Sequence, residues 1–463
     1  FNRIIPSTVT LEEFQRVLTD VCEATFPKRI KRRGRSAKYW WNDEIAEKRR
    51  VCIRLRREVT RTAKRRSQED VDLKREEYKQ GRRQLKQMIL KAKEKCWKGL
   101  LDELNENVWG DAYKIAVKRV GGRQPPQIDE RKRMEIAKSL FPEAANITWT
   151  KRRCTAEEVP PFGTEELQRA VDKLKMKKAP GLDGMTPEFV RLVAKVAPEH
   201  MMELYNRMLR DSYFPDIWKE AKLVFIEKGK SNEQGEALYR PICLLSIVGK
   251  LYERLLNNRL LEEIERKGSL SHRQYGFRKG KSTLDALEQV KGITEYVNSG
   301  AYRTRECCVM VTLDIQNAFN TVNWEGIVAV LEEWEISRYL IEVVKSYLDN
   351  RIIWVNEDER INMKMGVSQG SVLGPTLWNL FYDGVLNIQQ PETVTAIGYA
   401  DDLAIVVSGR SEEDIQRGVR IATQNIREWL QERGLNLAAE KTEAVLLVGR
   451  RKIKELRLDI AGV

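Results

Sequence analysis

Histidine and cysteine are scarce in this chain of 463 residues, which holds two histidines and seven cysteines. The cysteines form no C-x-x-C pair and have no histidine partner at metal-ligand spacing, which argues against zinc sites and disulfide frameworks. An odd, unpatterned cysteine count is typical of a reducing, intracellular setting. The adjacent Cys307 and Cys308 lie in an apolar run and are expected in the core. No apolar run is long enough to span a bilayer, so no membrane contact is expected.

The length predicts two or three domains or subdomains. The chain begins at Phe1 without a signal-peptide pattern, so we expect a piece of a longer chain. Composition and breaks at glycine and proline pairs divide it into four parts. These are the tail of a preceding region at 1–27, a basic helical extension at 28–125, a connector at 126–205 and a mixed α and β part at 206–463.

Positive charge is concentrated in one segment. The whole chain carries +14, but residues 28–98 hold 27 Lys or Arg and 10 Asp or Glu, a local charge of +17 that leaves −3 elsewhere. Apolar residues recur there at three- and four-residue steps, which predicts a long basic helix or a helical pair. Such a block is an electrostatic footprint for nucleic-acid phosphates, although a solvated helix face has the same composition. The candidate contacts are Arg32, Arg33, Arg54, Arg57, Arg65, Arg66, Arg82 and Arg83.

The texture changes to mixed α and β after residue 205. Apolar runs predict strands at Lys222–Ile226, Val309–Ile315, Val394–Tyr399, Leu403–Val407 and Val445–Val448, and helices at Ile247–Ile264 and between Ser411 and Gly434. Strands, then a helix, then a strand predict an α+β fold with a sheet layered on helices.

Acidic residues close these strands, where an isolated buried charge is costly. Asp314 ends one run, and Asp401 with Asp402 fills the short turn between two others. Turn chemistry alone also explains an aspartate pair. If the strand ends are adjacent, three carboxylates can hold two divalent cations for in-line phosphoryl displacement. Hard oxygen ligands favour two Mg²⁺ ions, with Mn²⁺ as a substitute.

An ordered set of motifs around these acids resembles one known family. Tyr399-Ala400-Asp401-Asp402 matches the Y-x-D-D signature of reverse transcriptases, and further segments follow in the family order. They are Ala179–Gly184, Tyr239–Ile242, Gln274–Arg278, Leu313–Phe319, Gly366–Pro375, and Gly434–Asn436 leading to Lys441-Thr442. The resemblance covers roughly residues 165–463 and is strongest to non-LTR (LINE-type) retrotransposon Pol polyproteins. The basic region is similar to that of arthropod type-1 elements.

For the catalytic site, the resemblance implies that Asp314 and Asp401 bridge two metal ions. Asp402 would be the third, less direct carboxylate, and Ile315 would offer its backbone carbonyl to the metal bound with the nucleotide. Lys441 would act near the leaving pyrophosphate as a proton donor or charge stabiliser, with a surface lysine as the alternative.

For nucleotide binding, the resemblance implies that Lys228 and Arg240 clasp the triphosphate. Phe319 would face the sugar 2′ carbon and select deoxynucleotides, unless it is ordinary core packing. Gln369 and Gly370 would line the nascent base pair and template, where glycine lets backbone approach a ligand closely. A glycine-rich turn without a ligand is the alternative.

The resemblance also implies a right-hand polymerase fold. We expect fingers beginning within 126–205, fingers and palm at 206–463, and the basic helical extension before them. The primer-grip hairpin and thumb would follow Val463 and are missing from the sequence. Two departures from the family pattern are Ser368, where proline is frequent, and Asn320, where aspartate is frequent. The serine should only soften the turn, and position 320 is not expected to bind metal.

The implied function is RNA-directed DNA polymerisation, in which the element copies its own transcript at a nicked target. The implied partners are template RNA, a DNA primer or target, and dNTPs, with an endonuclease domain elsewhere in the same polyprotein. Residues 27–33 are basic enough to serve nuclear import as well as nucleic-acid binding. Two alternatives remain open: an intron maturase that resembles reverse transcriptases, and a decayed copy that only binds RNA.

Overall fold

The chain divides into two compact units in the computed structural model, which describes residues 10–25, 41–63, 67–106, 128–150, 152, 154–231, 237–300, 306–449 and 458. Unit 1 contains Phe1–Pro27 and Ile128–Val463, and unit 2 contains Lys28–Gln127. Unit 2 nearly coincides with the basic extension expected at 28–125. None of the helices in the described ranges is both long enough and apolar enough to cross a membrane.

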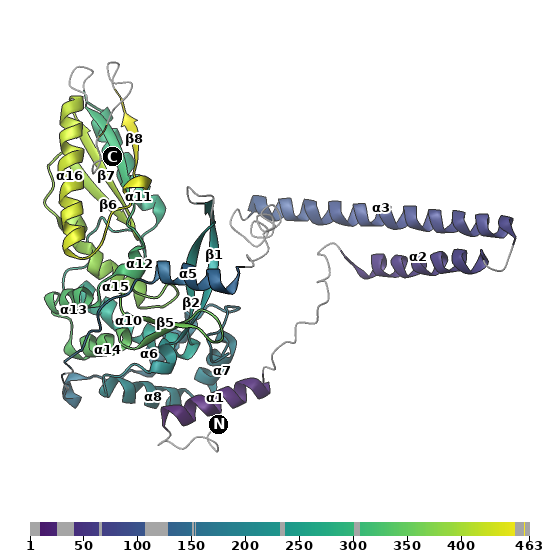
Figure 1. Cartoon of the computed structure of the whole chain (residues 1–463), viewed down its shortest axis with the longest axis horizontal. Coiled ribbons are helices and arrows are strands. Elements are labelled where there is room, and N and C mark those ends of the chain that lie inside the picture. The colour runs from purple at the N-terminus through teal and green to yellow at the C-terminus, as the bar shows by residue number, and fades with distance from the viewer. Residues whose placement is uncertain are drawn as a thin grey trace. The chain divides into compact units, whose positions relative to one another are not determined.

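Unit 2 is a pair of helices, α2 (Asp43–Thr62) and α3 (Gln68–Glu106), which lie antiparallel along each other (Figure 1). The side chain of Asn42 caps α2 by accepting the N–H of Ile45. Gly81 of α3 allows close approach, because a Cβ there would lie 3.2 Å from the Leu55 side chain of α2. The helical pair, one of the two forms predicted from the periodicity, is therefore confirmed.

Unit 1 begins with α1 (Leu11–Thr25), and its placement differs from the expectation that residues 1–27 belong to a preceding region. Phe14, Leu18 and Cys22 of α1 are buried in the main core of unit 1. Gln15 is also buried and accepts the indole N–H of Trp218 at 3.2 Å. The apolar pattern of α1 covers few residues, so the sequence did not show which part of the protein this helix packs against. Its buried contacts show that it belongs to unit 1.

The other helices of unit 1 surround two sheets. They are α5 (Glu130–Leu140), α6 (Thr164–Asp172), α7 (Pro187–Val196), α8 (Pro198–Arg210), α9 (Asp216–Lys219), α10 (Ile247–Arg266), α11 (Thr283–Asn298), α12 (Ala318–Thr321), α13 (Trp324–Glu333), α14 (Arg338–Leu348), α15 (Gly374–Tyr382) and α16 (Glu412–Glu432), with short 3-10 turns at Ala156–Glu158, Asp383–Asn387 and Ala439–Lys441. One continuous hydrophobic core includes residues before and after position 205. The connector expected at 126–205 is thus packed into the same body as the rest of unit 1.

The first sheet has the order β2-β1-β4-β5. Its strands are β1 (Ala221–Ser231), β2 (Ala237–Leu244), β4 (Arg351–Trp354) and β5 (Arg360–Met363). β1 pairs antiparallel with β2 and parallel with β4. The sequence patterns predicted β1 but not the other three strands, two of which have only four residues.

The second sheet has the order β6-β7-β3-β8 and is antiparallel throughout. Its strands are β3 (Cys307–Leu313), β6 (Val394–Tyr399), β7 (Asp402–Gly409) and β8 (Glu443–Val448). Helix α16 runs along this sheet (Figure 1), and its buried stripe from Ile415 to Leu430 is the one predicted from the sequence. The opposite face contributes Cys308, Ile397 and Val406 to a second core with α11 side chains. The sheet therefore has helices on both faces, which confirms the α+β class.

Two local predictions near this sheet are also settled. Ser411 and Asp414 form the predicted capping box of α16, and Cys307 and Cys308 are both fully buried. The expected strand at Val309–Ile315 lies two residues earlier, at Cys307–Leu313. Ile315 instead makes an isolated bridge with Leu437, which gives the end of that run a separate partner.

Candidate active site

The three aspartates lie at one end of the second sheet. Leu313 of β3 pairs with Leu403 of β7, so the next residue, Asp314, follows β3 beside the start of β7. Tyr399 pairs with Asp402 across the β6–β7 hairpin, which leaves Asp401 in its two-residue turn. Adjacent strand ends thus bring together acids that are far apart in the sequence.

The aspartates also lie within electrostatic reach of one another. Burial raises the pKa of Asp401, and the negative charge of Asp314 raises it further, whereas Lys228 and Arg240 lower it. Burial likewise raises the pKa of Asp402, with further increases from Asp401 and Asp314. Mutual repulsion of this kind favours the binding of a cation, since a cation removes it.

Asp314 is held from its other side by the segment that follows α16. The N–H of Ala438 donates to the Asp314 carbonyl at 2.8 Å, and the N–H of Gln316 donates to the Asn436 carbonyl at 2.9 Å. In this antiparallel pattern the carbonyl of Ile315 points away from its bridge partner Leu437. The Ile315 carbonyl is therefore not used by this pairing.

Lys441, from the same segment, reaches Asp314 at the end of β3. Its Nζ lies 2.8 Å from Oδ2 of Asp314, and the two side chains are 50% and 30% exposed. The structure therefore brings Lys441 to Asp314 rather than leaving it as an isolated surface lysine. The ion pair is partly open to water, so a competing cation or a charged substrate can exchange with it.

Whether the site suits Mg²⁺ depends on its donor chemistry. Within the described ranges, no group of three or more His, Cys, Asp or Glu side chains is arranged to hold a metal ion, and Asp314 directs one oxygen at Lys441. The donors nevertheless fit a hard divalent cation, because all of them are oxygens and the carboxylates repel one another. Sulfur and imidazole ligands do not contribute to this cluster of described residues.

Two cations of the first sheet face the same acids. The register pairs Ile226 with Arg240, and Lys228 lies just beyond the last regular pair, close enough to Arg240 for their charges to interact. Burial lowers the pKa of Lys228, and the positive charges of Lys441 and Arg240 lower it further, against the opposite effect of Asp314 and Asp401. Three basic side chains therefore surround the aspartates.

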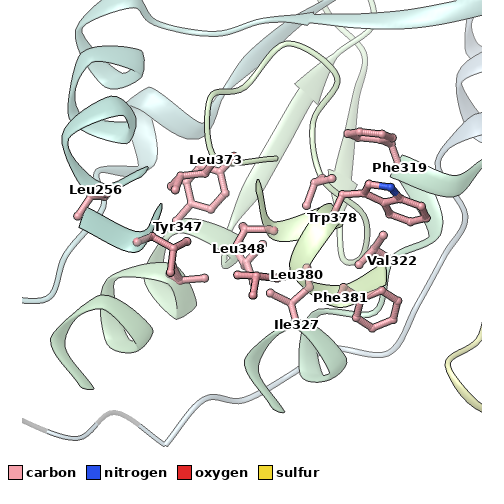
Figure 2. Packing of buried hydrophobic residues seen from close by; sticks show 14 of the residues in the cluster. Leu256, Phe319, Val322, Ile327, Tyr347, Leu348, Leu373, Trp378, Leu380 and Phe381 are labelled. Atoms are coloured by element: carbon pink, nitrogen blue, oxygen red, sulfur yellow. The ribbon is translucent and has the colours of Figure 1, made fainter. Parts of the chain in front are cut away.

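Phe319 lies next to the site in an aromatic stack. Its ring is 9% exposed and stacks on Trp378 with centroids 5.5 Å apart (Figure 2), and the exposed Phe277 contacts it edge-on at 5.7 Å. Because Trp378 covers one face of the Phe319 ring, the ring can pack in the core and still contact a ligand with its other side. Asn320, next in sequence, is buried and donates to the Asn317 side chain, which an aspartate could not do once ionised.

The loop with Gln369 and Gly370 is tied to the first sheet. The N–H of Cys243 donates to the Gln369 carbonyl at 2.8 Å. Gly370 has φ +124°, and a Cβ there would lie 2.5 Å from the Cys243 carbonyl, so glycine is required. This loop is therefore packed directly against β2.

Buried charges beneath that loop were missed by the sequence interpretation. Glu253 of α10 accepts the N–H groups of Val372 and Leu373, at 2.6 and 3.0 Å. The guanidinium of Arg351 donates to the hydroxyl of Ser368 at 3.2 Å, which gives the serine at this unusual position a partner. No motif pointed to Glu253 or Arg351, since a charged residue in a helix or strand ordinarily faces water.

Four of the eight arginines predicted to contact nucleic acid lie within the residues that the structure describes. Arg54 and Arg57 are exposed on α2, and Arg82 and Arg83 are exposed on α3. The remaining four candidates, Arg32, Arg33, Arg65 and Arg66, lie outside the described residues. The α2–α3 helical pair thus presents at least part of its basic surface to solvent.

Comparisons with known proteins bear on the same region. The family described as reverse transcriptase (RNA-dependent DNA polymerase) matches residues 226–460, which is just over half of the chain. A 115 kDa protein in the type-1 retrotransposable element R1DM of Drosophila melanogaster is 27% identical over 94% of this chain and 42% of its own length. The retrovirus-related Pol polyprotein from type-1 retrotransposable element R1 of Bradysia coprophila is 28% identical over 89% of this chain and 42% of its own.

A third relative belongs to a different element. The RNA-directed DNA polymerase from mobile element jockey of Drosophila melanogaster is 31% identical over 62% of this chain and 32% of its own length. The chain spans less than half the length of each of these relatives. The resemblance to reverse transcriptases of non-LTR retrotransposons is confirmed, and the chain belongs to the reverse transcriptase (RNA-dependent DNA polymerase) family.

Proposed function

We propose that this chain is the RNA-directed DNA polymerase part of a non-LTR retrotransposon polyprotein and copies the element's RNA into DNA at a nicked target. The observation that carries this proposal is the convergence of Asp314, Asp401 and Asp402 with the side chains of Lys228 and Lys441. An acidic centre ringed by cations suits a reaction in which metal ions and a triphosphate meet. In polymerase terms, the second sheet is the palm and the first sheet belongs to the fingers.

The acids hold the reaction centre. Asp314 and Asp401 are proposed to bridge two Mg²⁺ ions, with Asp402 as a further carboxylate and the Ile315 carbonyl as a backbone ligand. When bound, the ions activate the primer 3′ oxygen and neutralise charge on the transferring phosphate. Lys441, which is ion-paired with Asp314 at 2.8 Å, is proposed to supply charge or a proton toward the leaving pyrophosphate.

The cations and the aromatic stack select the substrate. Lys228 and Arg240 are proposed to clasp the triphosphate from the β1–β2 hairpin, because both are exposed on it. Phe319, supported from behind by Trp378, is proposed to clash with a ribose 2′ hydroxyl and so to favour dNTPs. Incorporation of rNTPs should therefore rise in Phe319→Ala, while a variant that still rejects rNTPs would limit the ring to core packing.

The basic helical pair is proposed to hold template RNA through phosphate contacts. Exposed arginines along both helices suit a backbone that carries one charge per nucleotide. Removing phosphate contacts lowers the slope of log affinity against log salt by about 0.7 per contact on a single strand. Changing Arg54, Arg57, Arg82 and Arg83 together to Gln should therefore flatten the slope by about 3, and an unchanged slope would remove this assignment.

The remaining parts of the proposal concern the whole protein. The length of the relatives, one of which is named a Pol polyprotein, supports a multifunctional polyprotein. An endonuclease elsewhere in it is proposed from the family resemblance alone. Nuclear action is proposed from the basic cluster at 27–33, which lies outside the described residues.

Incorporation of dNTP on a poly(rA)/oligo(dT) primer–template with Mg²⁺ is the direct test. The assay uses the full-length natural protein that contains these 463 residues. Activity in the parent and its loss in Asp401→Asn, with Asp349→Asn as an acidic control outside the cluster, is the expected result. Tight RNA binding without incorporation under any divalent metal would overturn the polymerase proposal and leave a maturase-like or RNA-binding role.

A further inference from the structure

The turn that carries the aspartate pair has a backbone that needs support. Ala400, its first residue, has φ +59°, a left-handed conformation that residues other than glycine rarely adopt. Nothing in the local sequence favours this state, since neither glycine nor asparagine occupies the position. The conformation persists only where surrounding groups hold it.

The support comes from the segment around Gln274. Gln274 is completely buried, and its Oε1 accepts the N–H groups of Ala400 at 3.3 Å and of Gly276 at 3.0 Å. The same segment is bonded to β6 on both sides of the glutamine: the N–H of Gly398 donates to the Arg273 carbonyl at 2.9 Å, and the N–H of Tyr275 donates to the Gly398 carbonyl at 2.8 Å. Gln274 is therefore anchored to the strand that leads into the turn.

Two further contacts constrain the backbone of Ala400 in this turn. The indole N–H of Trp378 donates to the Ala400 carbonyl at 3.1 Å. Gly276 lies so close that a Cβ there would fall 1.9 Å from the Ala400 nitrogen. Ala400 is thus held at its N–H, at its carbonyl and by direct backbone contact, immediately before Asp401.

The chemistry of Gln274 suits this task. Its oxygen reaches two backbone donors, while its Nε2 is buried and has no hydrogen-bond partner among the described residues. The side chain is thus positioned so that its oxygen accepts two hydrogen bonds, while its buried amide N–H group remains unpaired among these residues, which costs free energy. A neutral acceptor is required, because a carboxylate would add another buried negative charge beside the repelling aspartates.

We infer that Gln274 is a positioning residue that fixes the orientation of Asp401 and Asp402 through the amide of Ala400. This inference rests on the proposed polymerase site, although it concerns the geometry of the turn and not the identity of the template. The hydrogen bonds that the Gln274 side chain makes within the described residues go to the backbone N–H groups of Ala400 and Gly276, so we infer that it acts through the backbone of the turn. Loss of its acceptor should free Ala400 to leave the left-handed conformation and turn the carboxylates away from Asp314.

The test compares two buried glutamines changed to methionine, which keeps the volume and removes the acceptor. Gln274→Met is the test variant and Gln15→Met is its control, because Gln15 is also buried and bonds Trp218 away from the turn. We expect faster hydrogen exchange at the Ala400 amide and a loss of at least about tenfold in Mn²⁺ affinity in the first variant only. In polymerisation, its Mg²⁺ requirement should rise by a similar factor.

The outcomes separate this inference from the proposed function. Amide exchange and Mn²⁺ binding need no template, so they decide the role of Gln274 even if the parent incorporates no dNTP. Equal exchange and equal Mn²⁺ affinity in the two methionine variants would overturn the inference. If Gln274→Met does not fold, Gln274→Asn, whose amide is one methylene too short to reach Ala400, takes its place with the same expected results.

Discussion

Replacing Glu253 with alanine tests whether a buried carboxylate supports the loop that contains Gln369 and Gly370. Glu253 is 1% exposed, and its carboxylate accepts the N–H groups of Val372 and Leu373 just before α15. The guanidinium of Arg351, itself 2% exposed, lies close enough to lower the pKa of Glu253 against the stronger opposite effect of burial. Glu253→Ala therefore leaves two buried backbone donors without their acceptor, while the Arg351 guanidinium keeps its bonds to the Tyr347 carbonyl and the Ser368 hydroxyl.

The size of the effect follows from these contacts. Each unsatisfied buried donor costs about 1–3 kcal/mol, so the two together cost about 2–6 kcal/mol. At about 2–4 °C per kcal/mol, Tm should fall by about 4–24 °C. Glu253→Gln keeps one acceptor oxygen and should cost less, about 1–2 kcal/mol.

Urea denaturation and thermal melting measure this directly, with Glu262→Ala, an exposed glutamate on the same helix, as the control. The control should stay within about 0.5 kcal/mol of the parent. In an active protein, Glu253→Gln should also raise the KM for dNTP more than it lowers kcat, because the loop with Gln369 shifts. A Glu253→Ala protein as stable as the control would refute the idea that this carboxylate holds the loop.

The pH dependence of stability offers an independent check on Glu253. Burial raises the pKa of its carboxyl above the ordinary 4.5, so the folded state binds this proton more tightly than the unfolded chain does. The resulting stability is fully present below pH 4.5 and is lost as pH rises through the folded pKa. Glu253→Gln should flatten the stability profile over that range, as measured by urea unfolding at several pH values.

Three further predictions concern the site itself. Gly276→Ala places a methyl group against the Ala400 nitrogen and should lower dNTP incorporation by about 100-fold or more, whereas unchanged activity would show that the turn can retreat. Ser368→Pro introduces the residue frequent in the family but removes the hydroxyl that Arg351 bonds, so urea unfolding should show a loss of about 1–3 kcal/mol rather than a gain. Asp401→Asn removes one of three repelling carboxylates and should stabilise the protein in EDTA by roughly 0.5–2 kcal/mol, with melting temperature as the readout and a lower value as the contrary result.

Local patterns in the sequence carried much of the second sheet and its helix. The stripe from Ile415 to Leu430, the capping Ser411 and the strands around the Asp401 turn all follow from periods of 3.6 and 2 and from turn chemistry. Such signals are readable because they repeat within one element. The four-residue strands β4 and β5 are too short to repeat, and they were not predicted.

The sequence by itself determined which residues are proposed to carry the chemistry, because the aspartates and the motifs around them occur in a fixed order along the chain. Only the tertiary structure decided what holds those residues in place. Gln274 meets Ala400 across 126 positions, Glu253 meets Leu373 across 120, and Lys441 meets Asp314 across 127. No local periodicity links such pairs, and the sequence does not show whether a polar residue is buried or exposed. Its partner becomes visible only when strands and helices from distant parts of the chain pack together.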